Sequence, residues 1–218
     1  MPEPEQSTRD KLIDAAARLF AARGIESVSL AEIVRESGQR NTSAVQYHFG
    51  GRDDLLLAIL ERYVPAIRGR RLELLAIAQS DGPDARAAAE AIVRPVTELA
   101  QRGWRERAYL QIGSELTGTL DRAPRSIRNV LRKTAGFEAM ALLATRCPPV
   151  PEEIWVERSR LMYPFIGRAA ADRARRLGQR GAKEVLADDR FVDNLVDMLL
   201  GAMTAPATAH RTTNGRAS

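Results

Sequence analysis

The spacing of the apolar residues constrains the fold more than any other feature of this 218-residue sequence. Apolar residues recur every three or four positions through most of the chain, which matches the 3.6-residue turn of an α-helix. No segment of the sequence combines the alternating pattern of a half-buried strand with flanking turn residues. The sequence therefore predicts an all-α fold.

Start and stop signals delimit two helices near the N-terminus. The first begins near Ser7, an N-cap residue, and ends at Gly24, which suits a C-terminal cap. The second begins with an S-x-x-E capping box at Ser29, and it is short because Gly38 ends it.

A third helix begins near Asn41, a favourable N-cap, and ends by Phe49, because two glycines follow. Asp53 and Asp54 favour the start of a fourth helix, in which Pro65 removes one backbone hydrogen bond and introduces a kink. Beyond residue 80 the helices lengthen. We expect them near residues 84–101, 104–119, 124–146, 152–179 and 188–203.

The second and third helices form the helix-turn-helix pattern, whose second member lies in the DNA major groove. Val45 and Phe49 face inward, and Ala44 lets the backbone approach the duplex. The remaining side chains face outward and carry groups that hydrogen-bond phosphates or base edges. They are Thr42, Ser43, Gln46, Tyr47 and His48. A solvated surface helix is the alternative interpretation.

These residues resemble the TetR family of bacterial repressors. In that family the recognition helix ends with a Tyr-His-Phe motif, followed by a short turn, a basic residue, an acidic residue and leucines. Here the region reads AVQYHFGGRDDLLLAIL at 44–60. The segment RDKLIDAAARLFAARGIESVSLAEIVRESG at 9–38 is similar to the first two helices of the family. The resemblance covers residues 8–64 and implies a DNA-binding domain over residues 8–52.

The resemblance implies that the outward side chains of the third helix contact DNA, with Tyr47 and His48 holding phosphates. Arg52 occupies the family's basic position, where it could neutralise a phosphate. The turn at 37–41 is one residue longer than the usual Ala-Gly-Val-Ser turn of the family. We add Arg40 and Asn41, which lie in this lengthened turn, to the candidate DNA-binding residues.

The resemblance also implies that residues 53–203 form a larger antiparallel helical bundle that binds a small molecule and dimerises. Residues 188–203 are apolar on more than one side, so a helix there needs cover on two sides. A homodimer with two-fold symmetry would present two reading helices to a near-palindromic operator. The candidate interface residues are Phe191, Leu195, Leu199 and Met203. A single buried core helix is the alternative.

Large apolar residues on the helices that usually line the family's cavity are candidates for the ligand pocket. They are Trp104, Tyr109, Phe137, Met140, Trp155, Met162, Tyr163 and Phe165. A few polar groups would complete such a pocket. The candidates are Gln111, Glu115, Thr117 and Arg160. We expect an apolar or amphipathic effector.

The net charge of the chain is compatible with a nucleic-acid partner but does not require one. The net charge is +5, and all but three of the 33 basic residues are arginine, whose planar fork suits phosphate. Residues 1–71, however, hold eleven Lys and Arg against ten Asp and Glu, a balance of +1. One reading head alone therefore predicts modest affinity, and two heads on a dimer supply more contacts.

The sequence offers little for catalysis. It has two histidines, His48 and His210, and one cysteine, Cys147, with no P-loop, dinucleotide or metal-ligand spacing. We expect no enzymatic activity, no cofactor and no metal. No apolar run reaches 18 residues, and the acidic start MPEPEQS is not a signal peptide, so we expect a cytoplasmic protein without a membrane partner.

The sequence thus predicts a ligand-responsive transcriptional repressor that binds a double-stranded DNA operator as a dimer and is released or altered by its effector. The alternative is a helical sensor or adaptor without operator binding, which would use the basic stretches at 125–133 and 168–180. The ends, residues 1–7 and 204–218, are expected to be disordered.

Overall fold

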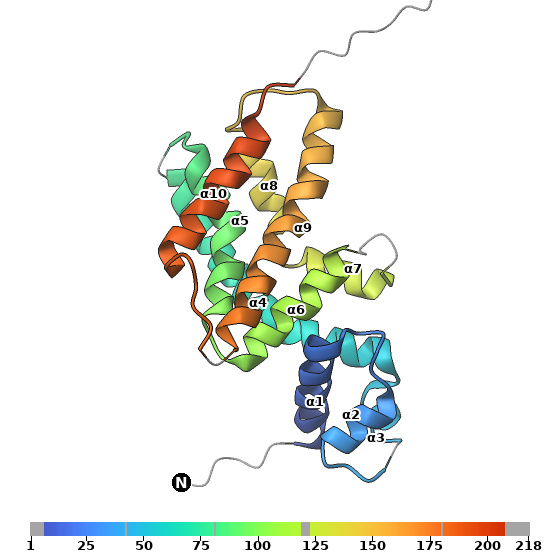
Figure 1. Ribbon diagram of the computed structural model, residues 1–218. Helices are drawn as coiled ribbons and strands as arrows, with labels where there is room; N and C mark the ends of the chain where they lie inside the picture. The colour runs from blue at the N-terminus through green and yellow to red at the C-terminus, as the bar shows by residue number, and fades with distance from the viewer. Residues whose placement is uncertain (1–6, 42, 81, 119–122, 180, 208–218) are drawn as a thin grey trace, which may run out of the picture.

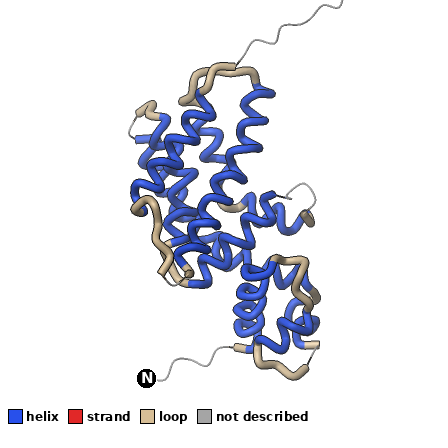
Figure 2. The backbone as a smooth tube through the Cα atoms, in the orientation of Figure 1, coloured by secondary structure: helices blue, strands red, loops and turns tan. Residues whose placement is uncertain are grey.

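The computed structural model describes residues 7–41, 43–80, 82–118, 123–179 and 181–207. Every regular element in these ranges is an α-helix, so the predicted all-α fold is confirmed (Figures 1 and 2). In chain order the helices are α1 (Thr8–Arg23), α2 (Leu30–Glu36), α3 (Ala44–Phe49), α4 (Arg52–Ser80), α5 (Ala85–Ala100), α6 (Trp104–Gly118), α7 (Arg125–Arg132), α8 (Gly136–Ala144), α9 (Glu152–Leu177) and α10 (Asp188–Thr204).

The helices form a small unit and a large unit. Figure 1 shows α1, α2 and α3 gathered at one end of the molecule, while α5, α8, α9 and α10 stand together at the other. Helix α4 is 29 residues long and packs against α1 and α3 as well as against α5. Helix α6 likewise packs against both α1 and α9, so two helices connect the small unit to the large one.

The sequence signals around the small unit hold in the structure. The Ser7 hydroxyl accepts the N–H of Asp10 at 3.1 Å and caps α1. The capping box of α2 is complete, because Ser29 Oγ accepts the Glu32 N–H at 3.2 Å while the Glu32 carboxylate accepts the Ser29 N–H at 2.8 Å. Gly24 ends α1 with a positive φ of 86°.

Of the ends predicted to be disordered, residues 1–6 and 208–218 lie outside the described residues. Ser7 caps α1 and Thr204 ends α10, so these two positions belong to the ordered fold.

The predicted start of the third helix is wrong by two residues, because the N-cap is Ser43 rather than Asn41. Asn41 does not cap α3; its side-chain oxygen accepts the N–H of Ser43 at 2.9 Å and closes a tight turn. The first helical residue is Ala44. The lengthened turn therefore uses Asn41 to reverse the chain before the helix begins.

The single helix predicted over 124–146 is also wrong, because α7 and α8 divide it. Ala135 lies between them with a φ of +60°, a left-handed conformation that non-glycine residues seldom adopt. The preceding carbonyl, of Thr134, accepts a hydrogen bond from the buried guanidinium of Arg71 at 2.5 Å. This contact with α4 gives the carbonyl a partner outside the helix, and no glycine or proline marks the break in the sequence.

Two groups of buried apolar side chains make the core. The first joins α1–α4 to α6, α7 and α9, and it includes Phe20, Ile33 and Leu55. The second lies between α4, α5, α8, α9 and α10, and it includes Ile92 and Leu199. Because the first group extends from the small unit into the large one, the two units pack as neighbours rather than as separate bodies.

Among the helices that the structure describes, none is both long enough and apolar enough to cross a membrane.

Substitution of Gly136 tests the close packing of α8. A Cβ there would collide with the Tyr163 ring of α9, so Gly136→Ala should lower the free energy of unfolding by about 1–3 kcal/mol. Gly69→Ala is the matched control, since the space beside Gly69 is open and alanine favours a helix by about 0.5–1 kcal/mol. Urea unfolding should therefore shift in opposite directions for the two variants, and equal shifts would contradict the packing described.

Candidate nucleic-acid interface and internal cavity

Helix α3 has one buried face and one polar face. Ala44 and Val45 are buried against the rest of the small unit. Ser43, Gln46 and Tyr47 are exposed, and Tyr47 is the most exposed aromatic side chain described, at 86%. A large side chain that stays in water while its neighbours are buried is available to a partner.

The other predicted DNA-binding residues are arranged around this face. His48 is half-buried and meets the Tyr47 ring edge-on at 5.0 Å. Arg40 and Asn41 are exposed in the turn before α3. Thr42 lies outside the described residues. The turn and the helix therefore bring Arg40, Asn41 and the polar face of α3 to one region.

Arg52 has a different position from the one expected for a phosphate ligand. Its Nη1 donates to the Ile25 carbonyl at 2.6 Å, and its Nη2 donates to the Val28 carbonyl. The guanidinium also lies 5.9 Å from the centre of the Phe20 ring. Arg52 therefore ties the start of α4 to the loop between α1 and α2, which fixes the support beneath α3.

Several cations of the small unit are already engaged. Arg23 pairs with Glu32 at 2.7 Å, and Arg62 pairs with Asp10. Arg9, Arg18, Arg35 and Arg40 are exposed and have no ion-pair partner in the part of the chain that the structure describes. The small unit therefore keeps some unpaired positive charges although its overall charge is nearly neutral.

Helix α6 contacts the small unit through two hydrogen-bonded carboxylates, one on α1 and one on α6 itself. Asp14 of α1 is buried, and its oxygens accept from Arg105 of α6 at 2.6 and 3.0 Å. The Glu115 carboxylate of α6 accepts the Ile25 backbone N–H at 3.1 Å. These two contacts hold α1 and the loop that follows it against the same helix, α6.

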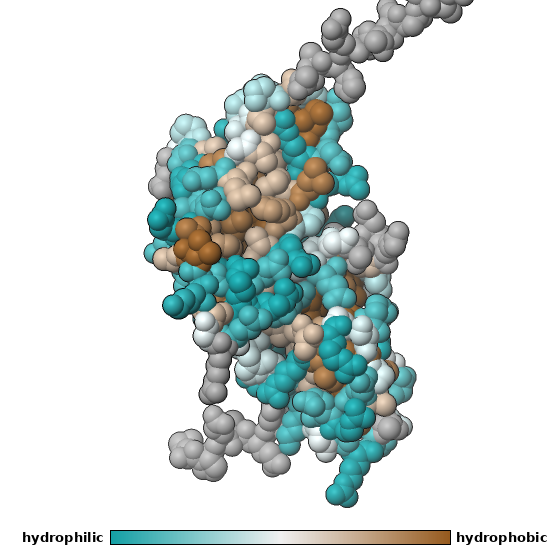
Figure 3. Space-filling view, in the orientation of Figure 1, coloured by the Kyte–Doolittle hydropathy of each residue, from teal (hydrophilic) through white to brown (hydrophobic). Residues whose placement is uncertain are grey.

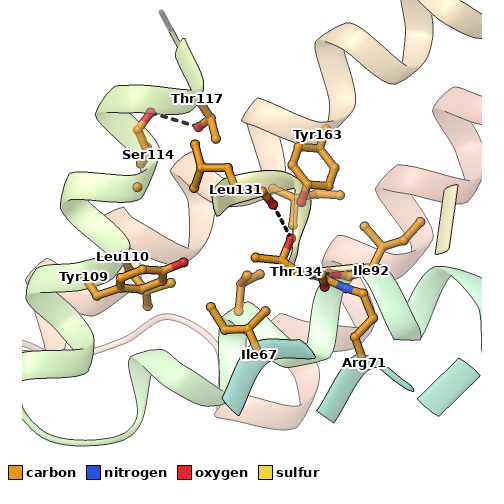
Figure 4. Close-up of a pocket in the computed structure, with 14 residues that line it drawn as sticks. Ile67, Arg71, Ile92, Tyr109, Leu110, Ser114, Thr117, Leu131, Thr134 and Tyr163 are labelled. Atoms are coloured by element: carbon orange, nitrogen blue, oxygen red, sulfur yellow. Dashed lines mark hydrogen bonds between the residues drawn. The ribbon is translucent and has the colours of Figure 1, made fainter. Parts of the chain in front are cut away.

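A cavity of about 70 Å³ lies inside the large unit, bounded by α4, α5, α6 and α9 and by the segment that ends α7 (Figure 4). Its walls are mainly apolar, and its polar groups are one guanidinium and several hydroxyls. Tyr109, Tyr163 and Thr117, which we singled out in the sequence, line it. So do Arg71, Ser114 and Thr134, which sequence reasoning missed.

The other large side chains proposed for the pocket lie elsewhere. Trp104 sits at the joint between the units, 4.2 Å from the Arg18 guanidinium. Met140 is buried and Met162 half-buried in the second core group. Phe137 and Phe165 are exposed at the surface, at 59% and 38%. Since Arg71 and Thr134 are far apart in sequence, only the fold reveals that they meet at the cavity wall.

The predicted dimer residues mostly face their own chain. Leu195, Leu199 and Met203 are at most 3% exposed, and Phe191 is half-buried beneath the Arg173 guanidinium, 4.4 Å away. The apolar residues that α9 and α10 do expose are Val156, Leu161, Phe165 and Met198. Figure 3 shows pale and brown surface gathered over these two helices.

The chain combines a helix-turn-helix unit that has a polar face with an all-helical bundle, and comparison with known proteins shows which regulators it resembles. Residues 12–59 match the profile of bacterial regulatory proteins of the tetR family. The HTH-type transcriptional regulator BetI of Brucella abortus (strain 2308) is 37% identical over 98 residues, which cover 44% of this chain and 48% of that protein. The HTH-type transcriptional regulator SrpR of Pseudomonas putida is 38% identical over 55 residues, a quarter of each chain.

Solved structures agree with the fold. AmtR of Mycobacterium smegmatis superposes with a TM-score of 0.60 and 21% identity, covering 91% of this chain and 89% of that one. AibR in complex with isovaleryl coenzyme A and operator DNA gives a TM-score of 0.57 and 19% identity, covering 89% and 98%. Residues 12–59 are thus similar to the tetR family of bacterial regulatory proteins, and the relatives named here are transcriptional regulators. The chain spans about half the length of BetI in the sequence match.

The capping box of α2 gives a pH-dependent contribution to stability. The N–H of Ser29, then the Arg23 guanidinium and the Ser29 hydroxyl, lower the pKa of Glu32 from 4.5 to about 2. The folded state favours the ionised carboxylate, so this contribution is complete above about pH 4.5 and is lost as the pH falls to about 2. Unfolding of Glu32→Gln should therefore depend less on pH in this range than unfolding of the natural chain.

The control is Glu26→Gln, an exposed carboxylate with no hydrogen-bond partner in the part of the chain described. Thermal unfolding recorded from about pH 6 to about pH 2 compares the three proteins. If Glu32→Gln keeps the full acid sensitivity of the natural chain, the capping box does not contribute as described.

Proposed function

We propose that the chain is a DNA-binding transcriptional regulator that reads its operator with α3. The observation that carries this proposal is the polar face of α3, where Ser43, Gln46 and Tyr47 are exposed, Tyr47 at 86%. Helix α3 itself lies at one end of the molecule (Figure 1). A six-residue helix gains little from solvent exposure of a tyrosine, whereas hydroxyl and amide groups on such a helix can contact bases and phosphates.

Each residue then has an assigned role. Gln46 and Ser43 contact base edges, and Tyr47 and His48 hold phosphates that set the register. Arg40 and Asn41 approach the DNA backbone from the lengthened turn, and Thr42 keeps the role assigned from the sequence. We no longer assign a phosphate to Arg52, because its guanidinium donates to two backbone carbonyls of the small unit.

Two copies of the small unit are needed, since residues 1–71 have a charge balance of only +1 and one unit alone would bind DNA weakly. We propose a homodimer formed through the outward faces of α9 and α10, with Leu161 and Phe165 at its centre. These residues are four apart and share a helix face, and they are 62% and 38% exposed. Apolar side chains grouped in this way on two adjacent helices favour association with an identical copy.

We further propose that residues 53–203 respond to a small molecule and residues 8–52 read DNA. Helix α6 supports this division, because Tyr109 and Ser114 line the cavity while Arg105 and Glu115 hold the small unit. A ligand that favours one position of α6 would change the separation of the two reading heads. It can alter operator affinity only by its differential affinity for the two positions. Repression follows when the occupied operator excludes transcription, and release by the ligand relieves it.

The DNA proposal is tested by selecting bound fragments from random duplex DNA with the purified chain, then measuring variants on the selected sequence. Gln46→Ala should weaken binding by roughly 5- to 150-fold per subunit and relax preference at one base position, given about 1–3 kcal/mol per base contact. Tyr47→Ala should weaken binding to all duplexes alike, because a phosphate contact carries no sequence.

The matched control is Gln179→Ala, an exposed glutamine that follows α9 in the large unit; it should leave DNA affinity unchanged. Circular dichroism checks that all variants fold. Failure of any duplex to outcompete random DNA would favour the helical sensor or adaptor without operator binding, and normal binding by both variants would exclude α3 as the reading helix.

The dimer proposal is tested by Leu161→Asp. A buried interfacial charge should raise the dimer dissociation constant by about 30-fold or more, taking roughly 2 kcal/mol for a central interface residue. Ile77→Asp is the control, because Ile77 is a half-exposed apolar residue on α4, outside the proposed interface. Sedimentation velocity should find monomers only for Leu161→Asp; a natural chain that is monomeric at all concentrations would contradict the proposal.

A further inference from the structure

Three charged side chains in the described part of the chain are more than nine-tenths buried: Asp14, Arg71 and Arg173. Asp14 is paired with Arg105 at 2.6 Å, and Arg173 is paired with Glu184 at 3.1 Å. Arg71 is 1% exposed, yet no carboxylate of the described residues lies within ion-pair distance of it. A buried charge without a counter-charge is costly, so this position calls for an explanation.

Backbone carbonyls satisfy only part of the guanidinium. Arg71 Nε donates to Ala91 at 3.0 Å, Nη1 to Thr134 at 2.5 Å and Nη2 to Ile92 at 3.4 Å. The Ala91 carbonyl is available because Pro95, four residues later, has no N–H to donate to it. Three of the five guanidinium N–H groups are thereby used, and two remain. Neutral carbonyls offset the charge less than an anion does.

The remaining donors belong to the wall of the cavity. Arg71, Tyr109 and Tyr163 all line it, and Figure 4 shows the tyrosine hydroxyls directed into the space that Arg71 borders. Neither hydroxyl has a hydrogen-bond partner among the described residues. Burial raises the pKa of Tyr109, so its hydroxyl stays protonated and can donate. One cation and two hydroxyl donors therefore converge on an otherwise apolar space.

We propose that this cavity binds a small monocarboxylate, with its oxygens accepting from Arg71 and from the tyrosine hydroxyls and its hydrocarbon part against Ile67, Ile92 and Leu110. The bound carboxylate would be the counter-charge of Arg71, which has no carboxylate partner among the described residues. This inference rests on the proposed function, because it names the chemical class of the effector. It narrows the apolar or amphipathic effector expected from the sequence to an amphipathic anion.

The size of the cavity narrows the ligand further. At about 70 Å³ it is well below the ~300–1,000 Å³ of drug-sized sites. An acid of two or three carbons fits without rearrangement. A longer acid requires the helices that line the cavity to move apart. One of them is α6, which is also the helix that holds Asp14 and Ile25.

The first experiment uses the full natural chain without DNA. Isothermal titration calorimetry compares acetate, propionate, butyrate and hexanoate with the neutral amides of the same acids. We expect one site per chain and at least tenfold weaker binding of each amide, as expected for loss of a charge-assisted contact. Equal binding of acid and amide, binding of inorganic phosphate in place of the acids, or no binding of any acid would overturn the proposal.

Variants locate the site. Arg71→Met should abolish the preference for acid over amide. Arg146→Met is the matched control, because Arg146 also donates to two backbone carbonyls, of Asp84 and Ala78, but lies outside the cavity. If Arg71→Met does not fold, the double variant Tyr109→Phe and Tyr163→Phe tests whether the acid binds in this cavity.

That double variant should weaken acid binding several-fold more than amide binding; an unchanged ratio of the two would contradict the proposed site. Because these titrations contain no DNA, failure here leaves operator binding by α3 untouched. Conversely, a chain that binds acids but selects no duplex would refute only the proposed function.

Discussion

The buried carboxylate of Asp14 is the contact on which the arrangement of the two units depends. It sits in α1, directly behind the helix-turn-helix, and receives two hydrogen bonds from Arg105 of α6. Without Arg105, the buried Asp14 carboxylate would lose both of these bonds and keep a longer contact with Arg62 at 3.5 Å, so the pair with Arg105 is important for holding α1 against α6. With Glu115 bound to the Ile25 N–H, α6 fixes α1 and the following loop together. The direction in which α3 points is thus set by a helix of the large unit.

Compensation of charge also organises the large unit. Arg173 is buried with its carboxylate partners and serves packing alone, whereas Arg71 is buried with carbonyls and a cavity. Pro95 has no N–H, so it leaves the Ala91 carbonyl free to accept a hydrogen bond from Arg71. The Thr134 carbonyl, just after α7, accepts a second one. The same contacts that break the helix between α7 and α8 therefore build the polar end of the cavity. Since α6 forms another wall, cavity and reading head share one structural element.

Local signals in the sequence placed α1, α2 and most helices of the large unit, but not the start of α3 or the break between α7 and α8. The Ser29 capping box and Gly24 act within a few residues, so pattern reasoning placed α1 and α2 correctly. Ala135 adopts a left-handed conformation because of Arg71, 64 positions earlier, and no local pattern reports such a contact. The interface role predicted for Leu195 has the same weakness. The apolar face of a helix does not show whether residues of the same chain or of a second chain cover it, and Leu195 is buried within its own chain. Charge burial at Arg71 likewise emerges only from the fold.

Hydroxyl-radical footprinting of the chain on its selected duplex tests the central claim most directly, namely that two copies of α3 enter successive major grooves. The account predicts two protected patches related by two-fold symmetry, with centres about 34–36 Å apart or a multiple of that spacing. A single patch, or protection spread evenly along the duplex, would contradict it.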